Sequence, residues 1–280
     1  MSRGCTGRLG IEQLSVFGLP PVDFINLAAD LGCDCISSGL TGFSYNPHGY
    51  AAFSLRDDAG LRREMRAAMR DRGIAISLGE GCIIRPESDI RAASRDMDIM
   101  RELGVERLNT VSMDPDLGRS LDQLALFAEM SAERGMAATI EMCPALTIGS
   151  LGAALAAVRH VGRPDFGLLL DTMHVGRSGA TAAEVAALEP ALIGYVQLCD
   201  APRTPSEPNY LKEATFERMV PGEGEMPLRE YLDVLPRGLT ISLEVPLRSL
   251  AEAGIGPEIR LRPCVEAARR LLAEVEAAQA

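Results

Sequence analysis

Residues 107–144 read RLNTVSMDPDLGRSLDQLALFAEMSAERGMAATIEMCP and contain a strand–helix–strand pattern. Two short runs rich in apolar and β-branched residues, 107–111 and 137–141, predict strands. The stretch between them, LDQLALFAEMSAERG at 121–135, has the apolar spacing of an amphipathic helix and ends in glycine, a common helix stop signal. A strand, a helix and a strand in this order predict two parallel strands joined by a right-handed crossover.

The same alternation continues along the whole chain of 280 residues. The predicted strands are Arg8–Leu14, Cys33–Ser37, Ile74–Leu78, Arg107–Val111, Ala137–Glu141, Phe166–Leu170, Gly194–Leu198 and Leu239–Glu244. Further helical patterns lie at 21–32, 61–73, 89–104 and 182–192, and a last one spans Glu258–Ala278. Eight units of about 35 residues predict an α/β fold, a (β/α)8 TIM barrel formed by residues 1–280 as a single domain. A doubly wound open sheet is the alternative, but its GxGxxG and GxxxxGK[ST] motifs do not occur.

The composition narrows the class of protein. A hydrophobic content of 47% supports a folded core, and a net charge of −11 argues against nucleic acid or an anionic membrane as partner. No apolar run approaches the ~18 residues of a membrane span, and MSRGCTGRLG at the N-terminus lacks the apolar stretch of a signal peptide. Seven cysteines without a CxxC pair predict buried thiols in a reducing compartment. We therefore expect a cytoplasmic protein with a small-molecule substrate.

Polar residues stand at the ends of the later strands. They are Glu141 in TIEMCP, Asp171 in GLLLDTMH, Gln197 in GYVQLCD and Glu244 in ISLEVP. For each alone, a salt bridge or a helix cap is an equally good explanation, but closure of a parallel barrel brings all four strand ends together. Buried carboxylates are costly unless they are paired or bind a metal. Three carboxylates and an amide suit Mn²⁺, Mg²⁺ or Co²⁺, so one divalent metal ion is the predicted cofactor.

Four other residues are candidates for the substrate pocket. His174 lies three residues after Asp171, and its pKa near neutrality suits acid–base catalysis, with a packed imidazole as the alternative. Arg203 has a guanidinium that would hold a substrate oxyanion or hydroxyl, or form a surface salt bridge. His48, in the loop TGFSYNPHGY, and Glu80, at the end of the third strand, would face the catalytic end of a barrel.

These motifs resemble the xylose isomerase-like TIM barrels, which include ketose 3-epimerases, hydroxypyruvate isomerases, inosose dehydratases and 3-dehydroshikimate dehydratases. The resemblance rests on TIEMCP, DTMH, QLCDAPR, PGEG and SLEVP and covers residues 135–250. It implies that His174 faces the substrate and that one divalent metal is bound by Glu141, Asp171, Gln197 and Glu244. Many epimerases of this family have histidine where Gln197 stands, and glutamine there is similar to the dehydroshikimate dehydratase branch. A homodimer or homotetramer is a further expectation from the resemblance.

The predicted reaction begins with removal of a proton from the carbon next to a carbonyl. A metal holding the carbonyl oxygen and a neighbouring hydroxyl would stabilise the enediolate, and Glu141 and Glu244 are the candidate base and acid. Return of the proton gives an isomerase or epimerase of a small polyhydroxylated carbonyl compound of the keto-sugar class. Loss of a β-hydroxyl, with His174 as the acid or base, gives a dehydratase instead.

Two other functions are disfavoured. The endonuclease branch of this superfamily needs many more than three histidines and a basic groove. A barrel without catalysis is disfavoured because all four ligand positions carry a metal-binding side chain.

Overall fold

The computed structural model describes residues 8–278. Eight parallel strands pair in sequence order and close, because β1 pairs with β8 as well as with β2. The strands are β1 (Leu9–Ile11), β2 (Cys35–Ser38), β3 (Ala75–Gly79), β4 (Arg107–Thr110), β5 (Ala137–Glu141), β6 (Phe166–Asp171), β7 (Ile193–Leu198) and β8 (Ile241–Leu243). The predicted (β/α)8 TIM barrel is confirmed, and closure excludes the open sheet.

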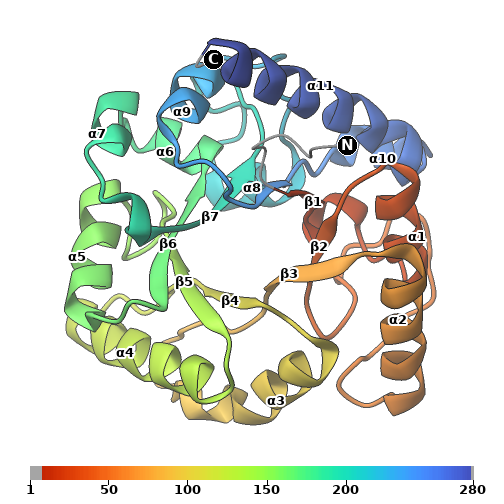
Figure 1. The fold of residues 1–280 in the computed structure, drawn as a ribbon, viewed down its shortest axis with the longest axis horizontal. Coiled ribbons are helices and arrows are strands. Elements are labelled where there is room, and N and C mark those ends of the chain that lie inside the picture. The colour runs from red at the N-terminus through yellow and green to blue at the C-terminus, as the bar shows by residue number, and fades with distance from the viewer. Residues whose placement is uncertain (1–7, 279–280) are drawn as a thin grey trace.

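Helices surround the barrel (Figure 1). The longer ones are α1 (Pro21–Asp30), α2 (Ala59–Arg72), α3 (Ser94–Leu103), α4 (Leu117–Glu133), α5 (Leu151–Val161) and α11 (Pro257–Ala278). The shorter ones are α6 (Thr172–Arg177), α7 (Ala182–Ala186), α8 (Tyr210–Phe216), α9 (Leu228–Val234) and α10 (Arg248–Glu252), with 3-10 turns η1 (Gln13–Val16), η2 (Ile90–Ala93) and η3 (Pro190–Leu192). Within residues 8–278, none of the helices is long and apolar enough to cross a membrane.

Local sequence signals explain where several helices begin and end. The side chains of Asp58, Asp116 and Ser150 accept backbone N–H groups at the starts of α2, α4 and α5. Gly73 ends α2 with a φ of 69°, a left-handed conformation that costs glycine little. These caps place the loops that follow β2, β4 and β5, and those loops border the mouth of the barrel.

The predicted and observed boundaries differ most at β1 and β8. The prediction Arg8–Leu14 for the first strand is too long, because the chain turns into η1 at Gln13, whose N–H donates to the Ser37 hydroxyl at 2.7 Å. The last strand ends at Leu243, so Glu244 is the first residue beyond it. The predicted helix 89–104 is divided into η2 and α3.

The apolar interior of the barrel ends just below the polar strand ends. Leu78, Leu169 and Tyr195 form a small buried cluster of their own. Leu169 and Tyr195 are register partners, and two residues further on so are Asp171 and Gln197. Because side chains alternate along a strand, the two pairs face the same side. The layer above the apolar cluster is therefore polar, as the strand-end pattern predicts.

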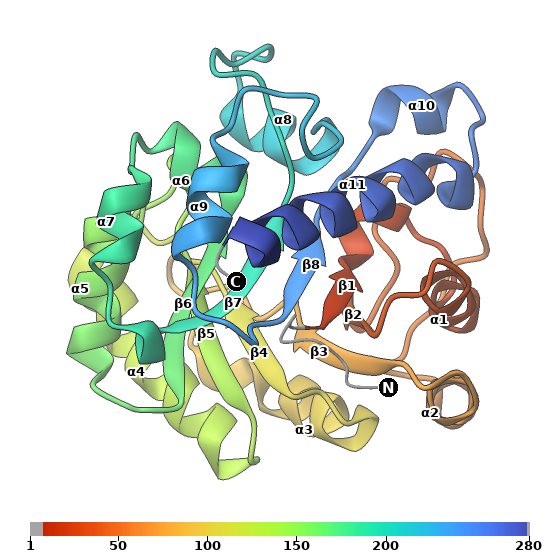
Figure 2. The same ribbon diagram turned by 45° about the horizontal axis from the view of Figure 1, so that its top comes forward.

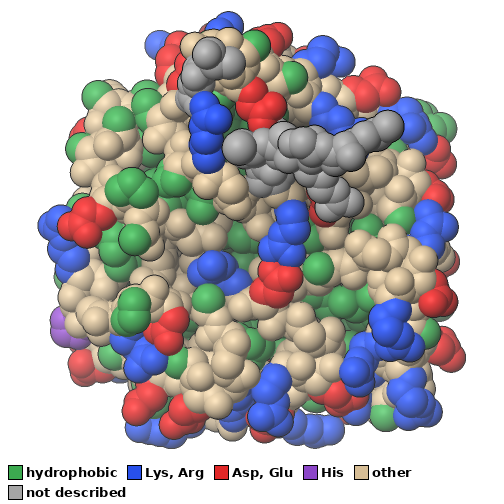
Figure 3. Space-filling view, viewed as in Figure 1, with side chains coloured by type: hydrophobic (Ala, Val, Ile, Leu, Met, Phe, Trp, Pro, Cys, Tyr) green, Lys and Arg blue, Asp and Glu red, His purple; other side chains and the backbone are tan. Residues whose placement is uncertain are grey.

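The distribution of charged side chains and the burial of the cysteines are those expected from the composition. Acidic and basic side chains are interspersed over the face shown in Figure 3. The six described cysteines are buried and free, as expected for small apolar residues. Cys5 lies outside the described residues.

Candidate active site

The four predicted metal ligands come from neighbouring strands, β5 to β8. Asp171 and Gln197 are register partners, and Glu244 follows β8 beside β7. Asp171, Gln197 and Glu244 are buried, with exposed fractions of 0%, 1% and 6%, and the Glu141 side chain is 12% exposed. The structure thus brings the predicted set to one end of the barrel.

The DTMH motif places His174 directly above Asp171. Asp171 is the N-cap of α6, and its Oδ1 accepts the N–H of His174 at 3.0 Å. His174 Nε2 lies 3.4 Å from Oε1 of Glu141, whose other oxygen accepts a hydrogen bond from Asn109 at 2.8 Å. One ligand atom each from Glu141, Asp171 and His174 lie within 4.8 Å of one another, the spacing of a metal site.

Tyr210 on α8 fixes the other side of the imidazole. Its hydroxyl lies 2.6 Å from Nδ1 of His174. Glu213 of the same helix binds Arg177 of α6 through two hydrogen bonds of 3.0 and 3.1 Å. Burial lowers the pKa of His174, but Asp171 and the hydrogen bonds around the ring outweigh burial and raise it well above its usual value. Tyr210 is a site residue that the strand-end pattern does not predict.

Arg218 is a second unpredicted residue, and it lies between two of the predicted ligands. Arg218 is 4% exposed, and its guanidinium donates to Oδ2 of Asp171 and lies 2.7 Å from Oε2 of Glu244. Burial raises the pKa of Asp171, but the charges of Arg218 and His174 and the hydrogen bonds that both donate together outweigh burial and lower it to about 2. Burial raises the pKa of Glu244 well above its usual value despite Arg218, and Glu141 and Asp171 add to the rise.

The residues present fit a divalent cation. The buried Oε1 of Gln197 has no hydrogen-bond partner among the described residues, while its Nε2 donates to Oε1 of Glu244 at 3.3 Å. The carboxyl groups of Glu141, Asp171 and Glu244 lie at the same end of the barrel. An unpartnered buried oxygen beside three carboxyl groups is the kind of oxygen-rich environment that a hard cation requires.

Asp200 organises the loop that contains the PGEG motif. Its carboxylate accepts the backbone N–H groups of Ala201, Gly222 and Met226 at 2.8 to 3.0 Å. A Cβ on Gly224 would lie 2.3 Å from Oδ1 of Asp200, so only glycine fits there. The motif therefore wraps the segment after β7 around Asp200.

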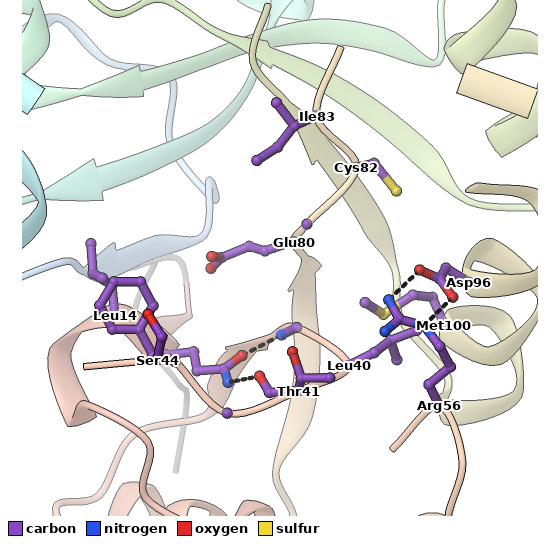
Figure 4. A pocket seen from close by; sticks show the side chains of 15 residues that line it. Leu14, Leu40, Thr41, Ser44, Arg56, Glu80, Cys82, Ile83, Asp96 and Met100 are labelled. Atoms are coloured by element: carbon purple, nitrogen blue, oxygen red, sulfur yellow. Dashed lines mark hydrogen bonds and ion pairs between the residues drawn. The ribbon is translucent and has the colours of Figure 1, made fainter. Parts of the chain in front are cut away.

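The structure places the three remaining candidates differently. Glu80 lines a cavity of about 510 Å³ beside the loops after β1, β2 and β3 (Figure 4). Arg203 is exposed, and its backbone N–H donates to Glu225 at 2.9 Å. His48 packs against Tyr50 with a centroid distance of 5.4 Å, and its Nε2 is buried. Of these three candidates, Glu80 lines the cavity, and Arg203 and His48 do not.

Comparison with known proteins places this architecture in a family. The model of the Xylose isomerase-like TIM barrel matches residues 25–264. The chain belongs to the xylose isomerase-like TIM barrel family. The match includes all four strand-end residues, from Glu141 to Glu244, so the resemblance inferred from the motifs is confirmed.

Proteins with different names resemble the chain. It is 28% identical over 187 residues to the 3-dehydroshikimate dehydratase of Pseudomonas aeruginosa, a match that covers 62% of this chain and 29% of the dehydratase. The IolI protein with a binding zinc atom superposes with a TM-score of 0.80, at 16% identity, over 96% of this chain and 99% of IolI. D-psicose 3-epimerase from Clostridium cellulolyticum H10, solved with D-tagatose, gives a TM-score of 0.69, at 14% identity, over 95% of this chain and 99% of the epimerase. The two structures share the fold of this chain.

Proposed function

We propose that the protein is a divalent-metal-dependent isomerase or epimerase of a small polyhydroxylated carbonyl compound of the keto-sugar class. The observation that carries the proposal is the convergence of Glu141, Asp171, Gln197 and Glu244 at one end of a closed barrel, with a buried Gln197 oxygen that lacks a partner. The zinc of IolI and the D-tagatose of the epimerase support a metal and a sugar substrate. We further propose a single cytoplasmic domain that binds Mn²⁺, Mg²⁺ or Co²⁺ and assembles as a homodimer or homotetramer.

Glu141, Asp171, Gln197 and Glu244 would hold the ion, which when bound polarises a carbonyl and stabilises the negative charge of an enediolate. Asn109 and His174 fix the two oxygens of Glu141, so this carboxylate is oriented to take a proton from the carbon next to the carbonyl. The raised pKa of Glu244 suits it to return a proton. Return to the opposite face of the same carbon gives an epimer, and return to the neighbouring carbon gives an aldose–ketose isomer.

A dehydratase is the second candidate, and His174 favours it. Tyr210 holds one ring nitrogen, the other faces Glu141, and the raised pKa keeps the imidazole protonated near neutrality. After Glu141 has removed the proton, His174 would give its proton to a departing β-hydroxyl, which leaves as water. Gln197 and the similarity to the Pseudomonas aeruginosa dehydratase support this alternative.

Exchange of substrate hydrogen with solvent tests the shared first step. The Mn²⁺-loaded protein should exchange the hydrogen next to the carbonyl of D-fructose in D₂O, as measured by NMR. Glu244→Gln should slow this exchange roughly a hundredfold, because the amide cannot transfer the proton. The exposed Glu64→Gln on α2 should leave it unchanged. Unchanged exchange in Glu244→Gln would remove Glu244 from the mechanism, and release of water would identify the dehydratase.

A further inference from the structure

A second group of carboxyls lies at the mouth of the barrel, after β1 and β3. Glu12 follows β1, and its N–H donates to the carbonyl of Leu243 at 2.9 Å, so it stands level with the end of β8. The side chain is fully buried, and Oε1 accepts the hydroxyl of Tyr195 at 2.9 Å. Its Oε2 has no hydrogen-bond partner among residues 8–278. A buried oxygen of this kind requires a donor.

Glu80 supplies the second carboxyl and faces the cavity. Its N–H donates to the carbonyl of Ser38 at 3.0 Å, and its buried Oε1 lacks a partner among the described residues. Figure 4 shows the carboxylate pointing into the cavity, away from the pair formed by Arg56 and Asp96. Burial is the main cause that raises the pKa of Glu80 well above its usual value, and the neighbouring Glu12 adds to the rise.

The charged groups at the mouth determine which ligand this pair accepts. Arg218 is already bound to two carboxylates of the candidate metal site. Arg56, the cation among the described residues that line the cavity, is held by both oxygens of Asp96 at 2.7 and 2.6 Å. The cavity therefore offers carboxyl oxygens to hydroxyl groups, and the described residues that line it offer a phosphate or a carboxylate no cation without a carboxylate partner.

We propose that Glu80, backed by Glu12, forms the subsite for the end of the substrate remote from its carbonyl, and that it selects free hydroxyl groups over an anionic group there. This inference rests on the proposed function, which supplies the metal-binding end of the same substrate. It specifies the substrate class as unphosphorylated ketoses. An acid pair suits such a substrate because a hydroxyl both donates and accepts a hydrogen bond.

Two variants of Glu80 test whether its hydrogen bonds to the substrate set the affinity. One removes these hydrogen bonds and the other keeps them. With the Mn²⁺-loaded protein and D-fructose, Glu80→Ala should raise KM about tenfold or more, because the hydrogen bonds to substrate are lost, and should change kcat by less than about threefold. Glu80→Gln should keep KM close to that of the unchanged protein, because the amide still donates and accepts. The exposed Glu64→Ala on α2 is the matched control and should have no effect.

The preference for a hydroxyl group over an anionic group is tested by comparing the KM values of two substrates. D-fructose 6-phosphate should show a KM at least about tenfold above that of D-fructose, and Glu80→Ala should narrow this gap. An unchanged KM for D-fructose in Glu80→Ala, or a preference for the phosphate ester, would overturn the subsite. Melting curves check that each variant is folded.

Binding of D-mannitol separates this inference from the proposed function, because mannitol has no carbonyl and cannot react. Calorimetric titration should detect mannitol binding to the unchanged protein and an affinity about tenfold lower in Glu80→Ala. If ketoses show no hydrogen exchange but mannitol binds in this way, the proposed reaction fails and the subsite stands. If mannitol does not bind, or binds Glu80→Ala equally well, the subsite is wrong.

Discussion

Arg218 is the residue that balances the candidate site in the absence of a metal ion. Its guanidinium joins Asp171 to Glu244 with almost no exposure to water. Each carboxylate keeps its second oxygen for other partners, and Oδ1 of Asp171 caps α6. Arg218 therefore joins two buried carboxyl groups and leaves one oxygen of each to a second partner.

Replacement of Arg218 by methionine should destabilise the metal-free protein. The change leaves two buried carboxylates without their cation, so the free energy of unfolding should fall by roughly 3–5 kcal/mol in urea with a chelator present. Mn²⁺ should restore part of this loss, because it binds the folded state and supplies positive charge. Arg91→Met, at an exposed pair with Asp89, is the control and should change little. Equal stability of the two variants would contradict the role given to Arg218.

The sequence predicts site residues where they end a strand and misses those in irregular segments. Glu141 and Asp171 end apolar runs, so barrel closure alone is enough to bring them together. Arg218 lies 47 residues from Asp171 in a segment without periodicity, and spacing says nothing about their contact. Glu12 is not predicted as a site residue because the pattern 8–14 predicts one long strand, whereas β1 ends at Ile11.

At the level of elements, α8 connects the segment after β7 to the candidate site. The helix carries Tyr210, which holds His174, and Glu213, which binds Arg177 of α6. Figure 2 shows α8 and α10 on the same side of the barrel. Phe216 at the end of α8 contacts Tyr45 of the loop after β2 with a centroid distance of 5.2 Å. The position of the imidazole thus depends on how firmly this short helix is anchored.

Loss of the ion pair between Glu213 and Arg177 should loosen α8 and leave the barrel intact. Glu213→Ala leaves the buried Arg177 unpaired, so amide hydrogen exchange across residues 204–217 should accelerate about tenfold or more. The strands should keep their protection, as mass spectrometry of peptides will show, while turnover falls because Tyr210 no longer holds His174. Lys212→Ala, at an exposed pair with Glu207, is the neighbouring control. Protection of α8 equal to that of the control would contradict the anchor.

Element prediction succeeded where packing follows the local pattern. The fifth strand, Ala137–Glu141, has the predicted boundaries because its buried run starts soon after α4 ends and stops at the polar Glu141. The helix predicted at 182–192 is instead α7 and η3, because Pro190 stands at the start of a new turn. Helices as short as α8 and α10 depend on tertiary contacts, which a hydrophobic period does not reveal.

For the whole molecule, the concentration of acids at one end of the barrel sets the response to pH. The pKa values of Glu80 and Glu244 are raised, mainly by burial, and that of His174 is raised by its acidic neighbours against the effect of burial. Each group binds its proton more tightly in the folded state than in the unfolded state. Its contribution to stability is therefore present below the unfolded pKa, 4.5 for glutamate and 6.5 for histidine, and is lost as the pH rises through the folded pKa.

The metal-free protein should consequently lose stability as the pH rises. In the presence of a chelator, its melting temperature should fall as the pH rises above about 5. Asp171 acts in the opposite direction, since its lowered pKa gives stability above 3.8 that is lost as the pH falls through about 2, outside this range. Mn²⁺ should flatten the curve, because it favours the ionised carboxylates. A melting temperature of the metal-free protein that rises with pH would contradict the raised pKa values of Glu80, Glu244 and His174.

The central claim is that the strand ends of β5 to β8 form one divalent metal site. Elemental mass spectrometry after Mn²⁺ loading tests it most directly, on the unchanged protein, on Asp171→Ala and on Asp165→Ala, whose carboxylate pairs with Arg163 just before β6. About one ion per chain is expected in the unchanged protein and in Asp165→Ala, and none in Asp171→Ala. Absence of metal from the unchanged protein, or its retention in Asp171→Ala, would rule out this metal site.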